Sequence, residues 1–497
     1  MKSILVATIG TRDLMFQVTT GDWYNIGDDR MKGDILGEQI EVVSDLALTE
    51  KSSFREISQY LWENIEYYGD QVKPVILGKL LEDKINDLEK VYLVVTDQNE
   101  TVKEREKDTL YSGELIKYWL NKLNSDLVVN ILYIGRNDEN PSNFEKMFRW
   151  WQQVWKENIE PQPDQPILLC LKGGVGQASE ASRISGLSLY GNDIKFYEFI
   201  PTPHDNQKGI SSDYTGPFLG TNYLWDRTRQ QALQLLERYD YAGLQNLVKP
   251  YYEQNKQKWK ETYALIKSGV SWNQGQFEDF FQSASFSFNN QQKEQHQQYW
   301  WMAYEQAYTA VVRLKQKNTT EAMLHSFRAV EGLIYECLKH EFKDYMVNSE
   351  YTYSSLQSSV LNKYPALKEL FVNNGNPVSE IKLDSRTQQR LIEKYIALTS
   401  PQANFKNLKA WGSEELRNHR NRLSHKLGGI SEGELYQAWG KDTYNQKDWE
   451  KRILNCLNLI TENKFNYLWQ GSLFASIHER VRTAIKNYNV VQSTKCN

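Results

Sequence analysis

Residues 166–190, PILLCLKGGVGQASEASRISGLSLY, decide the fold of the first part of the chain. The apolar run at 166–171 has the length of a buried strand, the small residues at 172–176 suit a turn, and residues 177–190 have the length of a helix. A buried strand that leads through a tight turn into a helix is typical of a parallel sheet with helices on both faces. The stretch therefore predicts an α/β domain.

The same pattern extends toward the N-terminus and a short way beyond residue 190. Further strands are expected at 3–9, 91–96, 128–134 and 194–200, and further helices at 113–123 and 144–157. Apolar strands separated by helices indicate a Rossmann-like, doubly wound domain, to which we assign residues 1–205. An insertion rich in Gly and Asp lies between residues 20 and 50, and no role follows for it from the sequence.

The pattern changes after Pro201. Residues 201–220 concentrate Pro, Gly, Ser and Asp, and we interpret residues 206–220 as a linker. Beyond the linker, apolar residues recur three and four positions apart, which is helical spacing, in stretches at 225–248, 301–317, 321–345 and 449–469. We therefore expect an all-helical region at 221–497, with the tryptophans of its helices packed in the interior.

Composition excludes several classes of protein. At 497 residues the chain is too long for one hydrophobic core, so we expect two or three domains. Its net charge is -4, and the sequence has no basic tail that would bind nucleic acid. The four cysteines are scattered at Cys170, Cys337, Cys456 and Cys496, which predicts neither disulfides nor a metal site. No stretch has the roughly 20 apolar residues of a membrane span, and the first residues do not form a signal peptide. We expect a cytoplasmic protein with no membrane partner.

Polar and small residues follow three of the predicted strands. The first strand ends in Gly10-Thr11-Arg12-Asp13, the second in Thr96-Asp97, and a later one in Lys172-Gly173-Gly174-Val175-Gly176-Gln177-Ala178-Ser179. Ligands of open parallel sheets bind beyond the carboxyl ends of the strands. Backbone N–H groups at a helix start, together with Lys172 and Arg12, suit a phosphate. The sequence therefore predicts a phosphate-binding site at this edge.

Two other interpretations of the glycines remain open. They can serve only the steric needs of a strand-to-helix turn. Alternatively, Gly174-x-Gly176-x-x-Ser179, with Glu198 about twenty residues further on, nearly matches a dinucleotide fingerprint. That fingerprint belongs after the first strand of the fold, where ATIGTRD lacks it, so a nicotinamide enzyme is disfavoured.

A second cluster, EELRNHRNRLSHKLGG, occupies residues 414–429. Ser413 is expected to cap the start of a helix, and Gly428-Gly429 to follow its end. On that helix Asn421 and His425 share one face, whereas Arg420 points about 140° away from His425. A histidine can transfer protons at neutral pH and an arginine can stabilise a phosphate in its transition state, so this trio suits phosphodiester cleavage. A solvated basic helix face is the structural alternative, particularly for Arg417 and Arg422.

Taken together, ATIGTRD and LKGGVGQAS at strand ends, followed by a helical region with RNRLSH, resemble the CARF–HEPN ribonucleases of type III CRISPR systems. The resemblance implies an antiviral endoribonuclease whose CARF domain binds a cyclic oligoadenylate activator and whose HEPN domain cuts single-stranded RNA without a metal or other cofactor. Arg420, Asn421 and His425 match the HEPN motif in order and are the implied catalytic residues. Near the HEPN site the resemblance and the motif itself add Arg417, Arg422, Ser424, Arg328 and Glu331.

On the CARF side the resemblance implies activator contacts at the three strand ends, from Gly10, Thr11, Arg12, Asp13, Thr96, Asp97, Lys172, Gly173, Gly174, Val175, Gly176, Gln177 and Ser179. It also implies a homodimer, since a two-fold axis would join two Arg–His motifs in one cleft and two CARF domains around one cyclic ligand. Cyclic tetra- and hexa-adenylate both remain open as activators. Some family members degrade their activator slowly, for which Thr11, Lys172 and Ser179 are candidates.

The main alternative of another class is a non-catalytic regulator. In that interpretation a ligand-binding Rossmann domain controls a helical module whose Arg–His cluster grips nucleic acid or protein. Replacement of His425 by alanine distinguishes the two, because phosphate binding alone tolerates the loss of a histidine better than the loss of Arg420.

Overall fold

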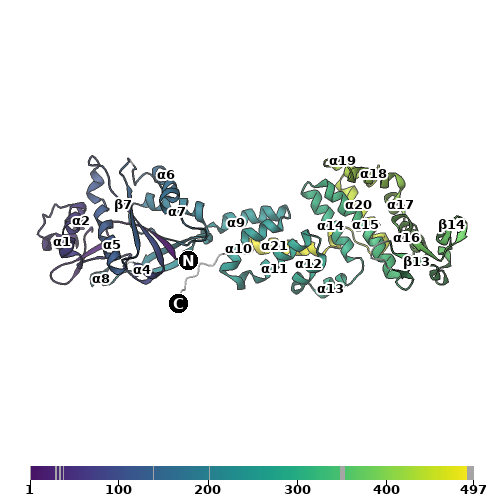
Figure 1. Cartoon of the computed structure of the whole chain (residues 1–497), viewed down its shortest axis with the longest axis horizontal. Helices are drawn as coiled ribbons and strands as arrows, with labels where there is room; N and C mark the ends of the chain where they lie inside the picture. The colour runs from purple at the N-terminus through teal and green to yellow at the C-terminus, as the bar shows by residue number, and fades with distance from the viewer. Residues whose placement is uncertain are drawn as a thin grey trace. The chain divides into compact units, whose positions relative to one another are not determined.

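The computed structural model describes residues 2–27, 31–32, 35–36, 38–137, 139–200, 202–347 and 353–489. These residues form two compact units, the first running to Asp226 and the second covering Arg227–Tyr488 (Figure 1). The boundary falls within helix α9 (Gly220–Glu237). This boundary lies beyond residue 205, where the sequence pattern placed the end of the first domain.

A six-stranded sheet with the order β11-β10-β9-β1-β7-β8 forms the centre of the first unit. All neighbouring strands pair in parallel except β10 and β11, which are antiparallel. The five strands expected from the sequence are all present in this sheet. The strands are β1 (Ser3–Thr8), β7 (Leu88–Thr96), β8 (Val128–Ile134), β9 (Ile167–Cys170), β10 (Ile194–Ile200) and β11 (Asp213–Leu219).

Both faces of the sheet are buried. Along β1, Leu5 and Ala7 belong to one apolar cluster and Ile4 and Val6 to another, because successive side chains of a strand point to opposite faces. Helices cover the two faces: α2 (Phe54–Glu63), α4 (Gly78–Lys84) and α5 (Leu110–Leu123) on the first, α6 (Phe144–Val154) and α7 (Gly176–Tyr190) on the second. This is the doubly wound α/β arrangement predicted from the sequence.

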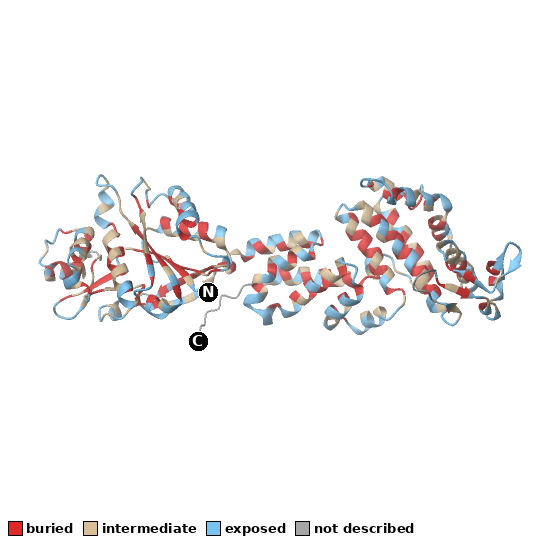
Figure 2. Ribbon diagram, viewed as in Figure 1, coloured by how far each residue is buried: buried red, intermediate tan, exposed pale blue. Residues whose placement is uncertain are grey.

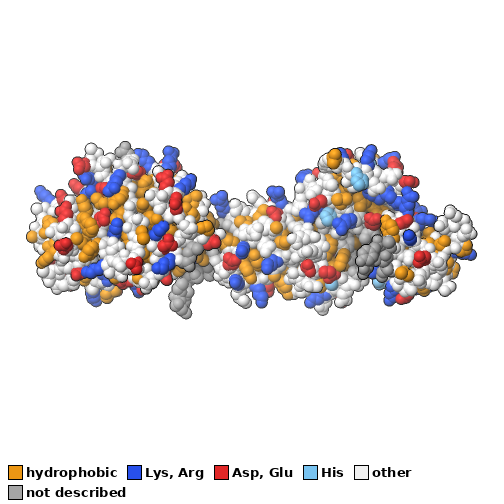
Figure 3. All heavy atoms as spheres, in the orientation of Figure 1, with side chains coloured by type: hydrophobic (Ala, Val, Ile, Leu, Met, Phe, Trp, Pro, Cys, Tyr) orange, Lys and Arg blue, Asp and Glu red, His pale blue; other side chains and the backbone are white. Residues whose placement is uncertain are grey.

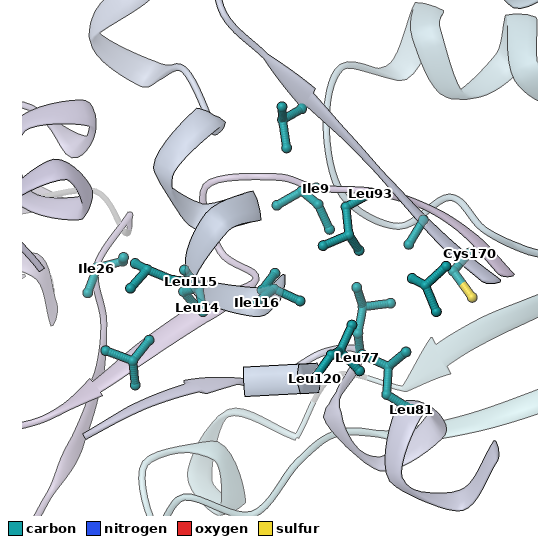
Figure 4. Close-up of a cluster of buried hydrophobic side chains, with 14 of the residues drawn as sticks. Ile9, Leu14, Ile26, Leu77, Leu81, Leu93, Leu115, Ile116, Leu120 and Cys170 are labelled. Atoms are coloured by element: carbon teal, nitrogen blue, oxygen red, sulfur yellow. The ribbon is translucent and has the colours of Figure 1, made fainter. Parts of the chain in front are cut away.

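Figure 4 draws side chains of the first of these clusters, among them Leu115, Ile116 and Leu120 of α5, with Leu115 beside Leu14 and Leu120 beside Leu77. Full burial of an aliphatic side chain of this size stabilises a fold by about 1.5–3 kcal/mol. The red interiors of both units in Figure 2 mark the same segregation of buried residues. The strands that end at the candidate ligand site are thus held from both faces.

The predicted linker at 206–220 is wrong for its second half. Residues 213–219 form β11, which pairs with β10, and the first unit extends to Asp226. Pro217 and Gly216, which suggested a loop, lie where the register of this pair shifts. An edge strand tolerates them, because only one of its sides needs backbone hydrogen bonds.

Shorter elements complete the first unit. The region after β1 adds a small antiparallel sheet, β3-β2-β6, to which part of the 20–50 insertion contributes. The elements are β2 (Leu14–Gln17), β3 (Trp23–Asn25), β4 (Met31–Lys32), β5 (Ile35–Leu36), β6 (Val72–Pro74), α1 (Glu38–Asp45), α3 (Ile65–Tyr68) and α8 (Pro203–Asn206).

The second unit is mainly helical, as expected. Its helices are α10 (Tyr241–Gln254), α11 (Lys256–Asn273), α12 (Phe277–Ala284), α13 (Asn290–His296), α14 (Trp301–Lys315), α15 (Thr319–Glu341), α16 (Ser385–Thr399), α17 (Lys406–Gly412), α18 (Glu414–Ser424), α19 (Glu432–Gln437), α20 (Gln446–Thr461) and α21 (Leu473–Asn487). The helical pattern at 225–248 is broken after α9, where Asp240 caps α10 by accepting a hydrogen bond from Gly243 N at 2.8 Å. The pattern at 449–469 ends as a helix at Thr461.

The expectation that residues 221–497 are purely helical needs one correction, because short strands occur between α15 and α16. They are β12 (Met346–Val347), β13 (Ser355–Gln357), β14 (Val372–Asn373), β15 (Asn376–Pro377) and β16 (Glu380–Lys382). Each has two or three residues, which is too short for an alternating pattern to be recognised in the sequence.

A buried carboxylate organises the core of the second unit. Glu305 of α14 is fully buried and accepts hydrogen bonds from the indoles of Trp272 and Trp301 at 2.8 and 3.1 Å. Ser472 Oγ and Leu473 N donate to the same carboxylate at 2.6 and 2.5 Å. Burial raises the pKa of Glu305, although these four hydrogen bonds act in the opposite direction. Trp272 and Trp301 thus pack in the interior, as expected for the tryptophans.

Charges of both signs are mixed over the face drawn in Figure 3. None of the helices that the structure describes is long and apolar enough to span a bilayer. Cys170, Cys337 and Cys456 are buried and free, in agreement with the prediction of no disulfides, whereas Cys496 lies outside the described residues.

Candidate functional site

The three strand ends that the sequence singled out lie side by side. β1 pairs with β9 on one side and with β7 on the other, so their carboxyl ends share one edge of the sheet. Thr8 Oγ1 donates a hydrogen bond to the carbonyl of Gly173 at 2.6 Å. A Cβ on Gly10 would lie 2.7 Å from Gly174 N, so the first and third strand ends are in direct backbone contact. Only glycine allows the two turns to approach this closely.

Asp13 lies beneath these turns and not at the surface. Its side chain is 1% exposed, and Oδ2 accepts a hydrogen bond from Gly10 N at 2.5 Å. Burial raises the pKa of Asp13 to about 7, against the opposing effects of the Gly10 hydrogen bond and the charge of Lys172. The expectation that Asp13 contacts a ligand directly is therefore wrong: the carboxylate supports the turn that would.

The second strand end carries more charge than the sequence suggested. Asp97 accepts hydrogen bonds from Arg55 at 3.0 Å and from Arg136 at 2.8 Å. Burial would raise the pKa of Asp97, but these two arginines outweigh it and lower the pKa. Asp97 therefore acts here as an anchor for two guanidinium groups. Thr96 exchanges hydrogen bonds with Thr109 at the start of α5, at 3.0 and 3.1 Å.

The exposed part of this edge consists of small and basic residues. Arg12, Lys172, Gly174, Gly176 and Gln177 are exposed. Thr11, Val175 and Ser179 are half-buried, and Ser179 Oγ donates to the carbonyl of Gly173 at 3.4 Å. No side chain among the described residues caps α7, whose first residue is Gly176. Together these features suit an anion, which the helix start and the two nearby cations would stabilise.

In the second unit, α18 carries the Arg–His motif. Ser413 caps its start by accepting a hydrogen bond from Leu416 N at 3.4 Å, as predicted. The helix ends at Ser424, four residues before the predicted glycine stop, and His425 is its C-cap residue. His425 and Asn421 are both exposed, and the backbone N–H of His425 donates to the carbonyl of Asn421 at 3.2 Å. Asn421 and His425 thus lie one turn apart at the end of the helix.

Arg420 occupies a slot between two aromatic rings. Its guanidinium carbon lies 4.2 Å from the centre of the Phe327 ring and 5.2 Å from that of Trp411, whose carbonyl accepts a hydrogen bond at 2.7 Å. Burial lowers the pKa of Arg420 to about 10, and the charge of Arg417 acts in the same direction. The group remains a cation at neutral pH, and the rings and the carbonyl hold it in one orientation.

The remaining residues near the motif have different surroundings. Arg417 donates to Gln389 Oε1 at 3.0 Å and to the carbonyl of Gly412 at 3.1 Å, which is a structural role. Arg422 contacts His419 Nδ1 at 3.0 Å, and Ser424 Oγ donates to the carbonyl of Asn421 at 2.8 Å.

Arg328 and Glu331 are both exposed on α15. The carboxylate of Glu331 raises the pKa of Arg420, which places Glu331 within electrostatic range of the motif. That these two residues belong to the site of the Arg–His motif stays a prediction.

Sequence reasoning missed four residues: Arg55, Arg136, Phe327 and Trp411. Arg136 directly follows β8, so the rule that ligands bind beyond strand ends could have found it. Phe327 lies in the helix that the sequence had already singled out, but its contact with Arg420 joins residues far apart in the chain. No local signal marks Arg55 or Trp411.

With this geometry established, the chain can be compared with known proteins. No protein-family model and no curated protein matches the sequence. Among solved structures, Enterococcus italicus Csm6 bound to cyclic hexa-2'-fluoro-hexa-dAMP matches with a TM-score of 0.57 and 12% sequence identity. The match covers 97% of this chain and 99% of the Csm6 chain.

The chain has the Csm6 fold. The match extends over both units, the α/β first unit and the mainly helical second unit. This confirms the architecture inferred from the resemblance. An identity of 12% carries the fold and not the residues, so the roles of Arg420, His425 and the strand-end residues rest on the geometry described above.

Proposed function

We propose that this chain is a single-stranded-RNA endoribonuclease of type III CRISPR antiviral defence, activated by a cyclic oligoadenylate bound at the strand ends of the CARF domain. One observation carries the proposal. Arg420 is fixed by aromatic rings while Asn421 and His425, on the same helix, stay exposed. A fixed cation and an exposed imidazole are the two kinds of group that phosphodiester cleavage uses.

The chemistry uses the RNA itself as the nucleophile. The ribose 2′-oxygen attacks the neighbouring phosphorus, the bond from phosphorus to the 5′-oxygen breaks, and a 2′,3′-cyclic phosphate and a free 5′-hydroxyl result. His425 moves the proton that leaves the 2′-hydroxyl or the one that reaches the 5′-oxygen. Arg420 stabilises the negative charge that develops on the phosphate. Because the nucleophile is internal, the proposed reaction needs no metal.

The proposed active form is a homodimer. One chain supplies one Arg420 and one His425, whereas transfer of two protons calls for two groups. A two-fold axis places two motifs in one cleft and two CARF domains around one cyclic ligand. The activator then changes the distance between the motifs, and this coupling is reciprocal: RNA bound at the HEPN cleft tightens activator binding.

The strand ends of the CARF domain support a cyclic phosphodiester ligand. Arg12 and Lys172 are exposed beside the uncapped start of α7, and Arg136 lies at the end of a neighbouring strand. The Csm6 structure that matches this chain holds a cyclic ligand built of six nucleotides. We therefore expect cyclic hexa-adenylate, in preference to cyclic tetra-adenylate, to activate this chain.

The test is cleavage of a fluorescently quenched single-stranded RNA in EDTA, with cyclic hexa-adenylate, cyclic tetra-adenylate or neither. We expect the wild type to cleave the RNA with only one of the two rings. His425→Ala should lower this cleavage by a factor of about 10² or more. Unchanged activator binding by His425→Ala is the matched control. Absence of cleavage by folded, dimeric protein with either ring would replace this proposal with the non-catalytic regulator.

A further inference from the structure

A cavity of about 590 Å³ lies among α12, α13, α14 and α15, apart from the residues of the Arg–His motif. This volume falls within the range of about 300–1,000 Å³ that is common for small-molecule sites. Trp301, Met302 and Tyr299 contribute apolar and aromatic surface. Lys339 lies 3.9 Å from Glu336, which also lines the cavity, and Arg328 adds a further positive charge. Neither the fold nor the proposed cleavage reaction accounts for this cavity.

Gly332 lines the cavity and adds no side chain to it. It lies in the interior of α15, a helix of 23 residues, where glycine costs about 1 kcal/mol relative to alanine. A Cβ at Gly332 would meet no atom of the described residues within 4 Å. By contrast, a Cβ at Gly269 would lie 2.2 Å from the ring of Tyr241, so packing within the protein requires that glycine. No such contact requires Gly332, and a larger side chain there would extend into open space at the cavity lining.

The cavity begins where the candidate ribonuclease site ends. Phe327 of α15 holds Arg420 at 4.2 Å, and the next residue, Arg328, already lines the cavity. Gly332 follows Arg328 by one helical turn, so both lie on the same stripe of α15. Glu331, whose charge raises the pKa of Arg420, belongs to the same stretch of α15. Neighbouring residues of one helix therefore contribute to the cavity and to the surroundings of Arg420.

The lining fits a planar, polar ring better than it fits an aliphatic side chain. Gln298, Gln306 and Glu278 provide donors and acceptors beside the aromatic surface. Glu278 contacts His296 Nε2 at 2.9 Å, and His296 stacks on Phe281 with a centroid distance of 3.5 Å. An aliphatic occupant would bury these polar groups without new partners, which is unfavourable. Proteins read unpaired RNA bases by this combination of stacking and hydrogen bonds.

We propose that this cavity receives an unpaired base of the RNA substrate next to the cleavage position. The inference rests on the proposed function for the nature of its ligand. In this proposal Arg328 contacts the backbone of the nucleotide whose base enters the cavity. Gly332 leaves room for that base because it has no side chain. Base preference of cleavage would then arise one nucleotide from the scissile bond.

The experiment measures binding, so that it does not depend on cleavage. Full-length His425→Ala is titrated with a fluorescently labelled single-stranded RNA and with a set of RNAs that each lack one base. Removal of one particular base is expected to weaken binding at least tenfold. Adding Gly332→Leu is expected to weaken binding of the intact RNA by a similar factor and to abolish the dependence on that base. Gly332→Ala, whose Cβ meets open space, is the matched control and should bind as the parent does.

Several results would overturn the inference. One is wild-type RNA affinity and base dependence in folded Gly332→Leu. Another is loss of the dimer on sedimentation of this variant with RNA binding intact, which would assign the cavity to a second copy of the chain. Arg328→Gln, at an exposed position, provides a second variant should the leucine prevent folding; unchanged affinity there would also count against the inference. Base-dependent binding without any cleavage by wild-type protein would refute the proposed reaction but support the proposed base site.

Discussion

Substitution of Gly173 by alanine tests whether the candidate activator site depends on the contact between two strand ends. A Cβ at this position would lie 2.1 Å from Asp13 Oδ2 and 2.5 Å from both Gly10 N and Thr8 O. These atoms cannot move aside easily, because Asp13 is buried and already bonded to Gly10 N, and the other two belong to the backbone. The loop that carries Lys172 must therefore shift away from the first strand end.

Overpacking by one methyl group typically costs about 1–3 kcal/mol. If the loop moves only in the absence of activator, this energy appears as an activator affinity lower by a factor of about 5 to 150. If the loop stays in place, it appears as a loss of stability in the first unit, at about 2–4 °C in Tm for each kcal/mol. The two effects together should account for the cost.

Calorimetric binding of cyclic hexa-adenylate and the activator concentration at half-maximal RNA cleavage measure the first effect, and thermal unfolding measures the second. Gly176→Ala is the matched control for stability, because a Cβ there meets nothing within 4 Å. Wild-type Tm and wild-type activator binding in Gly173→Ala would refute the reasoning. An equal loss of Tm in Gly176→Ala would show that the packing contact is not the cause.

Three further predictions follow from buried charges. Arg420→Lys keeps the charge but loses the planar group between Phe327 and Trp411, so the maximal cleavage rate should fall by about 10² with the half-maximal activator concentration unchanged, in a titration of activated cleavage. The raised pKa of Asp13, about 7, means that the contribution of Asp13 to the stability of the first unit is greatest below pH about 4, where the unfolded carboxyl is also protonated, and falls as pH rises toward 7. In urea unfolding across this range, Asp13→Asn should remove this part of the pH dependence. Glu305→Ala leaves buried donors unpaired and should lower the free energy of unfolding by about 3 kcal/mol or more, measured with urea, while a smaller loss would contradict the role of this carboxylate.

The sequence by itself determined the elements of the sheet and most helices. Apolar runs such as 166–171 and helical spacing such as that of 301–317 are local patterns. Such segments need a buried apolar face, but they do not need one particular neighbouring element. The order Arg420, Asn421, His425 on one short helix is equally local, since helix geometry alone places the last two on one face. The clustering of three strand ends also followed, because parallel strands end at one edge.

Tertiary structure decided what these residues touch. β11 is a strand because β10 offers it an edge, although its composition resembles a loop. Asp13 lies under a turn, Asp97 binds two arginines, and Arg420 lies between Phe327 and Trp411. Each of the last two arrangements joins side chains from different elements of the fold. Burial and charge pairing depend on distance in space, which a linear sequence does not specify until the chain has folded.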